Sequence, residues 1–248
     1  MAKLYSEKGR FVFAVIFSLF EALIVALIVF SDLDQTVLCY SAIMAAFIAV
    51  FLFFFEDKRQ NAVFLVASFL TLVSDFFLVI MYGSSGKYVY QCLGVTFFCT
   101  VHIAYAVYLG GLFFNRALFV GLRLSLPAIV GVVSFFVLKS AGNYLSLASS
   151  VYFTLLLLNT VSAFLKIRKT GVFAVGLLFF VLCDLFLGLQ LADGVFFTLP
   201  SWLKSVVFLP FNVVWVCYGV SQTLIALHVI KPVSRRKKEV FSEKIKTV

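Results

Sequence analysis

The sequence predicts an all-α, polytopic membrane protein that is a bundle of eight transmembrane helices. The chain has 248 residues, of which 63% are hydrophobic and only 12% are charged, and its mean hydropathy is +1.12. A soluble domain carries about 25% charged residues. Eight apolar stretches follow one another, each about 20 residues long and therefore able to cross roughly 30 Å of hydrocarbon. They use nearly all of the chain, so we expect one integral membrane domain over residues 1–248.

The connections between these stretches are short, so sequential helices are expected to be neighbours. The first span follows basic residues as a signal peptide does, but it is too long for the apolar region of one and lacks a small-residue cleavage site. We therefore expect a retained helix. Continuous hydrophobicity excludes an outer-membrane barrel, whose strands alternate apolar and polar residues. The expected spans are 11–30, 36–55, 62–82, 89–109, 117–138, 145–165, 171–191 and 205–230.

The distribution of Lys and Arg orients the bundle. With the N-terminus inside, the inside segments hold 17 of the 20 basic residues, Arg123 included, and the outside holds Lys87, Lys139 and Lys204. We expect both termini to be cytoplasmic and residues 231–248 to form a basic cytoplasmic tail. The net charge of +9 is best explained by anionic lipid headgroups beside the helix ends. The expected partner is thus the lipid bilayer and not nucleic acid.

This pattern predicts a multi-pass protein of the cell membrane, meaning the inner membrane of a bacterium or the endoplasmic reticulum membrane of a eukaryote. The five cysteines lie within or beside the spans and form no CxxC or Cys/His cluster, so we interpret them as small buried residues. With two histidines in the chain, a three-His zinc site cannot be assembled. A mixed His/Asp metal site is compatible with the sequence, but no spacing calls for it. We expect no cofactor and no metal.

Two carboxylates lie at matching depths inside the spans. Asp75 is 13 residues after the start of span 62–82, and Asp184 is 13 residues after the start of span 171–191. Both helices run from inside to outside and rise about 1.5 Å per residue, which places both acids at one level nearer the outer leaflet. Their contexts, "VSDFFL" and "LCDLFL", are faintly similar. Two acids at one depth are hard to explain as separate structural groups, so we interpret them as a functional pair.

Other polar residues could share this level. His102 and Tyr105 are spaced i, i+3, and Tyr218 and Gln222 are spaced i, i+4, so each pair lies on one face of its helix. The third, fourth, seventh and eighth helices are thus predicted to surround one polar chamber. Taken alone, Tyr105 and Tyr218 are equally explained by packing, as is His102.

Three further polar residues fit the chamber less well. Glu21 and Asn159 are as well explained by hydrogen bonds between helices, which are worth about 1 kcal/mol each in a membrane. His228 lies near the cytoplasmic end of the last span.

A buried acid pair has a defined chemistry. Burial and a neighbouring carboxylate both disfavour ionisation, so one of two adjacent acids stays protonated near neutral pH while the other ionises. A general acid and a carboxylate in one site can hydrolyse an acid-labile bond. The same residues could instead relay protons in a proton-coupled transporter or belong to a non-catalytic lipid-binding protein. The sequence has no GxSxG, HExxH, P-loop or GxGxxG motif for other chemistries.

Four motifs occur in a characteristic order. They are "SD" at Ser74 and Asp75, "FCTVHIAY" from Phe98, "FFVLCD" ending at Asp184, and "YGVSQTLIAL" from Tyr218. In order and spacing, roughly over residues 62–230, the chain resembles the YhhN family, whose animal members are lysoplasmalogenases of the transmembrane protein 86 group. Tyr152 also fits that pattern, while Cys183 stands where the family usually has Ser before the second Asp.

The resemblance implies a lipid hydrolase that cleaves the vinyl ether bond of a lysophospholipid substrate, a lysoplasmalogen, to a fatty aldehyde and a glycerophospho-head group. It implies that Asp75 and Asp184 are catalytic and that His102 orients or tunes one of them. The implied substrate-binding residues are Tyr105, Tyr218, Gln222, Ser74 and Asn159.

Overall fold

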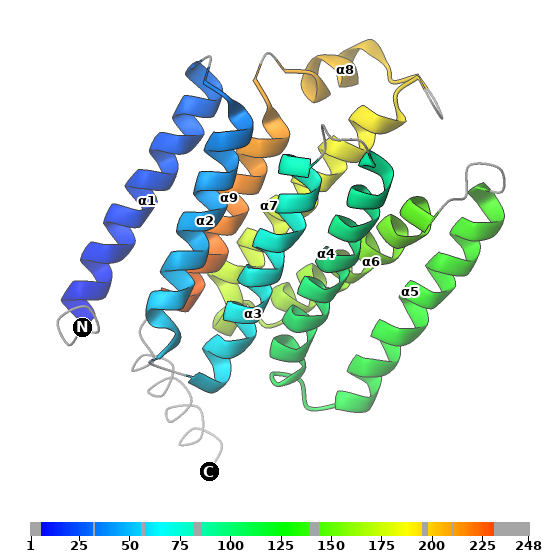
Figure 1. Cartoon of the computed structure of the whole chain (residues 1–248). Coiled ribbons are helices and arrows are strands. Elements are labelled where there is room, and N and C mark those ends of the chain that lie inside the picture. The colour runs from blue at the N-terminus through cyan, green and yellow to red at the C-terminus, as the bar shows by residue number, and fades with distance from the viewer. Residues whose placement is uncertain are drawn as a thin grey trace.

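The chain folds into long helices that lie side by side, as the computed structural model shows (Figure 1). The structure describes residues 6–31, 33–55, 58–81, 86–138, 144–194, 198–209 and 211–230. The elements are α1 (Glu7–Phe30), α2 (Gln35–Phe54), α3 (Lys58–Asp75), the π-helical turn η1 (Phe76–Ile80), α4 (Lys87–Gly110), α5 (Arg116–Leu138), α6 (Tyr144–Leu165), α7 (Ile167–Ala192), α8 (Ser201–Val207) and α9 (Val213–Ile230).

Eight helices in the described part of the chain are long and apolar enough to cross a membrane, with α3 and η1 forming one of them. Many large apolar side chains point away from the bundle, such as Leu118 and Ile129 of α5, which are 60% and 56% exposed. In water such a surface would be costly, but in a bilayer it faces lipid. The predicted fold class is therefore confirmed. The cytoplasmic location of the termini stays a prediction, and both the predicted basic tail at 231–248 and Lys139 lie outside the described residues.

The predicted start of the last span is wrong. We expected one helix over 205–230, but the structure has the short helix α8, which ends at Val207, and a separate helix α9 that begins at Val213. Hydropathy does not register this break, because the stretch between the two helices is itself apolar. The sequence places Pro210 there, and proline cannot donate the next helical hydrogen bond and disfavours helical backbone in the residue before it.

Six helices close into a ring. Around this ring α2 packs on α3, α3 on α4, α4 on α6, α6 on α7, α7 on α9, and α9 again on α2. Helix α1 lies outside the ring against α9 and α2, and α5 lies at the opposite edge against α6 (Figure 1). The expected neighbour order thus fails at α5, because α6 and not α5 packs closely against α4.

Aromatic side chains fill the inside of the ring. Phe64, Phe173 and Phe180 are among the largest fully buried side chains, and Phe64 meets Phe173 edge to face with ring centroids 5.4 Å apart. The polar chamber expected from the sequence is therefore a packed core with polar groups set into it.

Polar contacts fasten the ends of the bundle. At one end Arg10 of α1 is buried and donates to the backbone carbonyl of Ile230 at the end of α9. At the other end, where α8 lies (Figure 1), Lys204 bonds to Asp193 at 2.8 Å. The Lys204 ammonium and the backbone N–H of Leu199 together hold the pKa of Asp193 below its usual range.

Helices α7 and α9 approach closely at Gly176, where an added Cβ would lie 3.2 Å from the backbone oxygen of Ser221. We expect Gly176→Leu to lower the free energy of unfolding by about 1–3 kcal/mol, because backbone cannot move aside as a flexible side chain can. Gly188→Leu is the matched control on the same helix, since nothing lies within 4 Å of an added Cβ there. Thermal unfolding in detergent measures both variants, and equal losses would contradict this account of the contact.

Candidate functional site

Asp75 lies at an irregular point of its helix. It is the last residue of α3, and the chain then continues through the π-helical turn η1. Such turns are rare and recur at functional sites. The preceding Ser74 donates to the backbone oxygen of Gly94 at 2.6 Å, which ties α3 to α4. The Asp75 side chain is 3% exposed, and Tyr218 of α9 donates to its Oδ2 at 2.5 Å.

Asp184 has a matching partner. The hydroxyl of Tyr152 on α6 donates to Oδ2 of Asp184 on α7. Asp184 is half-buried, whereas Tyr152 is buried. Counted along the observed helices, Asp75 and Asp184 each lie 17 residues after the first residue of their helix, so both acids lie toward the end of the bundle that carries α8.

The two tyrosine–aspartate pairs lie close together. Phe180 packs against Tyr218, with ring centroids 5.3 Å apart. Phe98 contacts both tyrosines, with ring centroids 5.6 Å from Tyr152 and 6.5 Å from Tyr218. The structure thus brings the two predicted acids into one region inside the ring.

His102 lies next to this region. Its ring is fully buried and packs against Tyr152, with centroids 5.2 Å apart, and against Phe180 at 5.4 Å. Asn159 of α6 donates to the backbone oxygen of His102 at 2.8 Å. Gln222 lies one turn after Tyr218, is 5% exposed, and its Nε2 has no hydrogen-bond partner among the described residues.

Other predicted or noted residues lie elsewhere in the core. Tyr105 is 1% exposed, and its ring lies 5.2 Å from that of Phe173, so packing is its main visible role. His228 is hydrogen-bonded to Tyr108 at 2.9 Å and lies in the last turn of α9, toward the end of the bundle opposite the acid pair. Glu21 is buried on α1 and faces Thr223 of α9, outside the ring.

Two residues of the site were not identified as site residues from the sequence. Tyr152 fits the family pattern but was not assigned a role. It lies seven residues before Asn159 and therefore on the same face of its helix. Arg123 was counted as a cytoplasmic anchor, but it lies inside α5 and donates to Oδ1 of Asn159 at 3.3 Å. Its position within the predicted span 117–138 was the signal that could have identified it.

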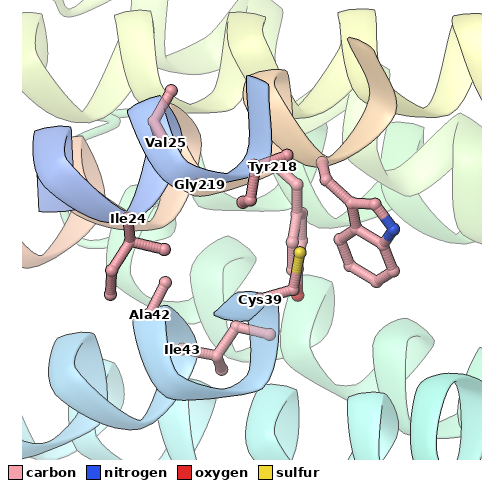
Figure 2. Close-up of a pocket in the computed structure, with 9 residues that line it drawn as sticks. Ile24, Val25, Cys39, Ala42, Ile43, Tyr218 and Gly219 are labelled. Atoms are coloured by element: carbon pink, nitrogen blue, oxygen red, sulfur yellow. The ribbon is translucent and has the colours of Figure 1, made fainter. Parts of the chain in front are cut away.

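A small apolar pocket with a cavity volume of about 10 Å³ adjoins the site (Figure 2). Tyr218 connects the two, because its ring lines the pocket while its hydroxyl bonds to Asp75. A cavity of this volume has room for about one water molecule, and most ligand pockets have about 300–1,000 Å³, so the pocket as it stands is too small for a lipid chain. The lining residues come from α1, α2 and α9 and are Ile24, Val25, Ile28, Cys39, Ala42, Ile43, Trp215, Tyr218 and Gly219.

The model of the YhhN family matches residues 33–229, which is most of the chain. The protein belongs to the YhhN family. The resemblance inferred from the four motifs is therefore confirmed. The YhhN match contains the ring and both tyrosine–aspartate pairs and begins after α1. No curated protein and no solved structure matches the chain.

The two tyrosine hydroxyls are expected to differ in their effect on stability. Tyr218→Phe removes a donor from a carboxyl that is 3% exposed, so we expect it to lower the free energy of unfolding by about 1–3 kcal/mol. Tyr152→Phe should cost less, because Asp184 is half-buried and can find another partner. The control is Tyr144→Phe, whose hydroxyl is exposed. Unfolding in detergent ranks the three variants, and an equal effect at all three positions would rule out this reading.

Proposed function

We propose that this protein is a membrane hydrolase that cleaves the vinyl ether bond of lysoplasmalogens, releasing a fatty aldehyde and a glycerophospho-head group. The observation that carries the proposal is the pair of carboxyl groups, Asp75 and Asp184, each held by a tyrosine hydroxyl, with the two tyrosines packed against the same Phe98 ring. Membership of the YhhN family is consistent with a hydrolase.

The reaction requires an acid and an anion in one place. A neutral carboxyl donates its proton to the β-carbon of the vinyl ether, whose double-bond electrons form the new C–H bond and leave an oxocarbenium ion. Water adds to the cationic carbon and loses a proton to a carboxylate. The resulting hemiacetal then loses its hydroxyl proton to a carboxylate as its bond to the glycerol oxygen breaks, the glycerol oxygen takes up a proton from a carboxyl, and the aldehyde leaves. General acid catalysis of this kind is worth about 10²–10⁴-fold, and a nearby carboxylate stabilises the cation.

The tyrosines orient the two acids for these steps. Tyr218 donates to Oδ2 of Asp75 and Tyr152 to Oδ2 of Asp184. An oxygen that accepts from a phenol is best left without a proton, so in each acid Oδ1 is the oxygen better placed to carry or accept the reacting proton. One acid then serves as proton donor while the other faces the developing positive charge.

The pocket beside Tyr218 supports a lipid substrate. Its lining is apolar apart from the Tyr218 hydroxyl and the Cys39 thiol, which suits a hydrocarbon chain next to the reacting double bond. Since its volume is too small for a whole lysophospholipid, the substrate enters as the surrounding helices separate. A position between helices also lets a lipid reach the acids directly from the bilayer.

The proposal is tested with purified protein and a 1-alkenyl lysophospholipid. Wild type should release free fatty aldehyde, and Asp75→Asn and Asp184→Asn should each reduce the rate by about 100-fold or more, because each removes one member of the acid pair. Glu21→Gln is the matched control, since it removes an intramembrane carboxyl that lies outside the ring, and it should retain the rate within a few-fold.

A saturated 1-alkyl lysophospholipid, which has no vinyl ether, should yield no aldehyde. Absence of aldehyde from wild type, or full activity in both Asn variants, would exclude the hydrolase. If the protein instead drives substrate-coupled proton uptake in liposomes without releasing aldehyde, it is a transporter.

The position of protonation is a second test. When the reaction runs in D₂O, we expect the released aldehyde to carry one deuterium on the carbon next to the carbonyl, because an exchangeable acid delivers a deuteron to the β-carbon. Mass spectrometry of the aldehyde, trapped as it forms, measures the label. An unlabelled aldehyde would contradict protonation at carbon and would require another route of cleavage.

A further inference from the structure

The amide nitrogen of Asn159 contacts His102 at two atoms. Its Nδ2 donates to the backbone oxygen of His102 at 2.8 Å and lies 3.5 Å from the ring nitrogen Nδ1. Both residues are fully buried. The amide therefore faces the imidazole from a fixed direction.

Arg123 fixes which end of the Asn159 amide faces the histidine. One terminal guanidinium nitrogen of Arg123 lies 3.3 Å from Oδ1 of Asn159, and it also donates to Oγ of Ser162 at 2.8 Å. Arginine has donors only, so the atom of Asn159 that faces Arg123 must be the oxygen. The NH₂ group must then face His102, because the reverse orientation would set donors against donors.

This orientation determines the protonation of His102. A ring nitrogen that faces an NH₂ donor presents its lone pair, so Nδ1 carries no hydrogen. The hydrogen of the neutral ring is then on Nε2. That atom is buried and has no hydrogen-bond partner among the described residues, while the ring it belongs to packs against Tyr152, which bonds to Asp184.

We propose that Arg123 and Asn159 are positioning residues that hold His102 with its hydrogen on Nε2, so that this N–H donates a hydrogen bond to an oxygen of the reacting system. The oxygen belongs either to the glycerol part of the lipid or to the attacking water. This last step rests on the proposed function, whereas the placement of the hydrogen does not. In this arrangement Nε2 does not remove a proton from substrate or water.

The hydrogen is located by nitrogen NMR on the full-length protein labelled at histidine in lipid nanodiscs. The chain has two histidines, and the signals of His228 are identified by their loss in His228→Gln. We expect the His102 signals of the wild type to show a protonated Nε2 and an unprotonated Nδ1. A hydrogen on Nδ1 in the wild type overturns the proposal, whatever the aldehyde assay gives.

Asn159→Asp reverses the contact, because a carboxylate oxygen accepts where the amide nitrogen donated. The hydrogen of His102 should move to Nδ1 in this variant, and an unchanged spectrum in a folded Asn159→Asp protein also overturns the proposal. Arg123→Gln should give a mixture of the two forms, since the amide is then free to turn. Ser162→Ala, which removes another partner of Arg123 without touching His102, should leave the spectrum unchanged.

Kinetics identifies the oxygen that accepts from Nε2. In Asn159→Asp, kcat/KM for aldehyde release should fall by about 100-fold, as for loss of one oriented donor, while Ser162→Ala stays within a few-fold of wild type. A rise in KM alone assigns the oxygen to the bound lipid, whereas a fall in kcat alone assigns it to the water. Unchanged kinetics in a variant whose hydrogen has moved would remove His102 from the reaction.

Discussion

The hydrogen bond from Tyr218 to Asp75 connects residues that are 143 positions apart in the sequence, and much of the bundle is arranged around it. Helices α3 and α9 are not among the closely packed pairs, since α2 lies between them in the ring. The bond therefore crosses the inside of the ring. Hydrocarbon supplies no hydrogen-bond donors, so a carboxyl at this depth must find one within the protein. In this structure the closed ring brings α9 within reach of α3.

The same constraint explains why polar contacts recur between the ring helices. Ser74 bonds to the α4 backbone, Tyr152 joins α6 to α7, and Asn159 joins α6 to α4. Each of these contacts satisfies a polar group that the bilayer cannot satisfy. They also set the rotation of the helices that carry Asp75, Asp184 and His102, so the groups that stabilise the bundle orient the site as well.

Depth and composition could be predicted from the sequence, because a helix rises by a constant amount per residue. The apolar composition predicts the eight spans, and the constant rise predicts the common level of Asp75 and Asp184. The start of α9 could not be predicted by the same reasoning, because the residues around Pro210 are as apolar as a span. A local backbone rule about proline, and not hydropathy, decides where that helix begins.

Partners across the ring could not be predicted, because they depend on which helices become neighbours and on how each is rotated. Depth places Tyr152 and Tyr218 within reach of either acid, yet the structure gives one tyrosine to each. The partner of Arg123 could not be predicted from the sequence either. Its charge suggests a lipid anchor when residues are counted along the chain, but the packing of α5 on α6 turns its guanidinium toward Asn159.

Helix α1 raises a separate point about access to the acids. It lies outside the ring and outside the stretch matched by the family, yet it supplies Ile24, Val25 and Ile28 to the wall of the pocket beside Tyr218. The ring itself is fastened by bonds that cross it, whereas α1 packs against its outer surface and is tied to α9 by the bond from Arg10 to Ile230. A path for a lipid chain therefore requires the smallest change in the structure if α1 moves away from α9 and α2 while the ring stays closed. Under the proposed function, this movement would widen the pocket while the acids keep their tyrosine partners.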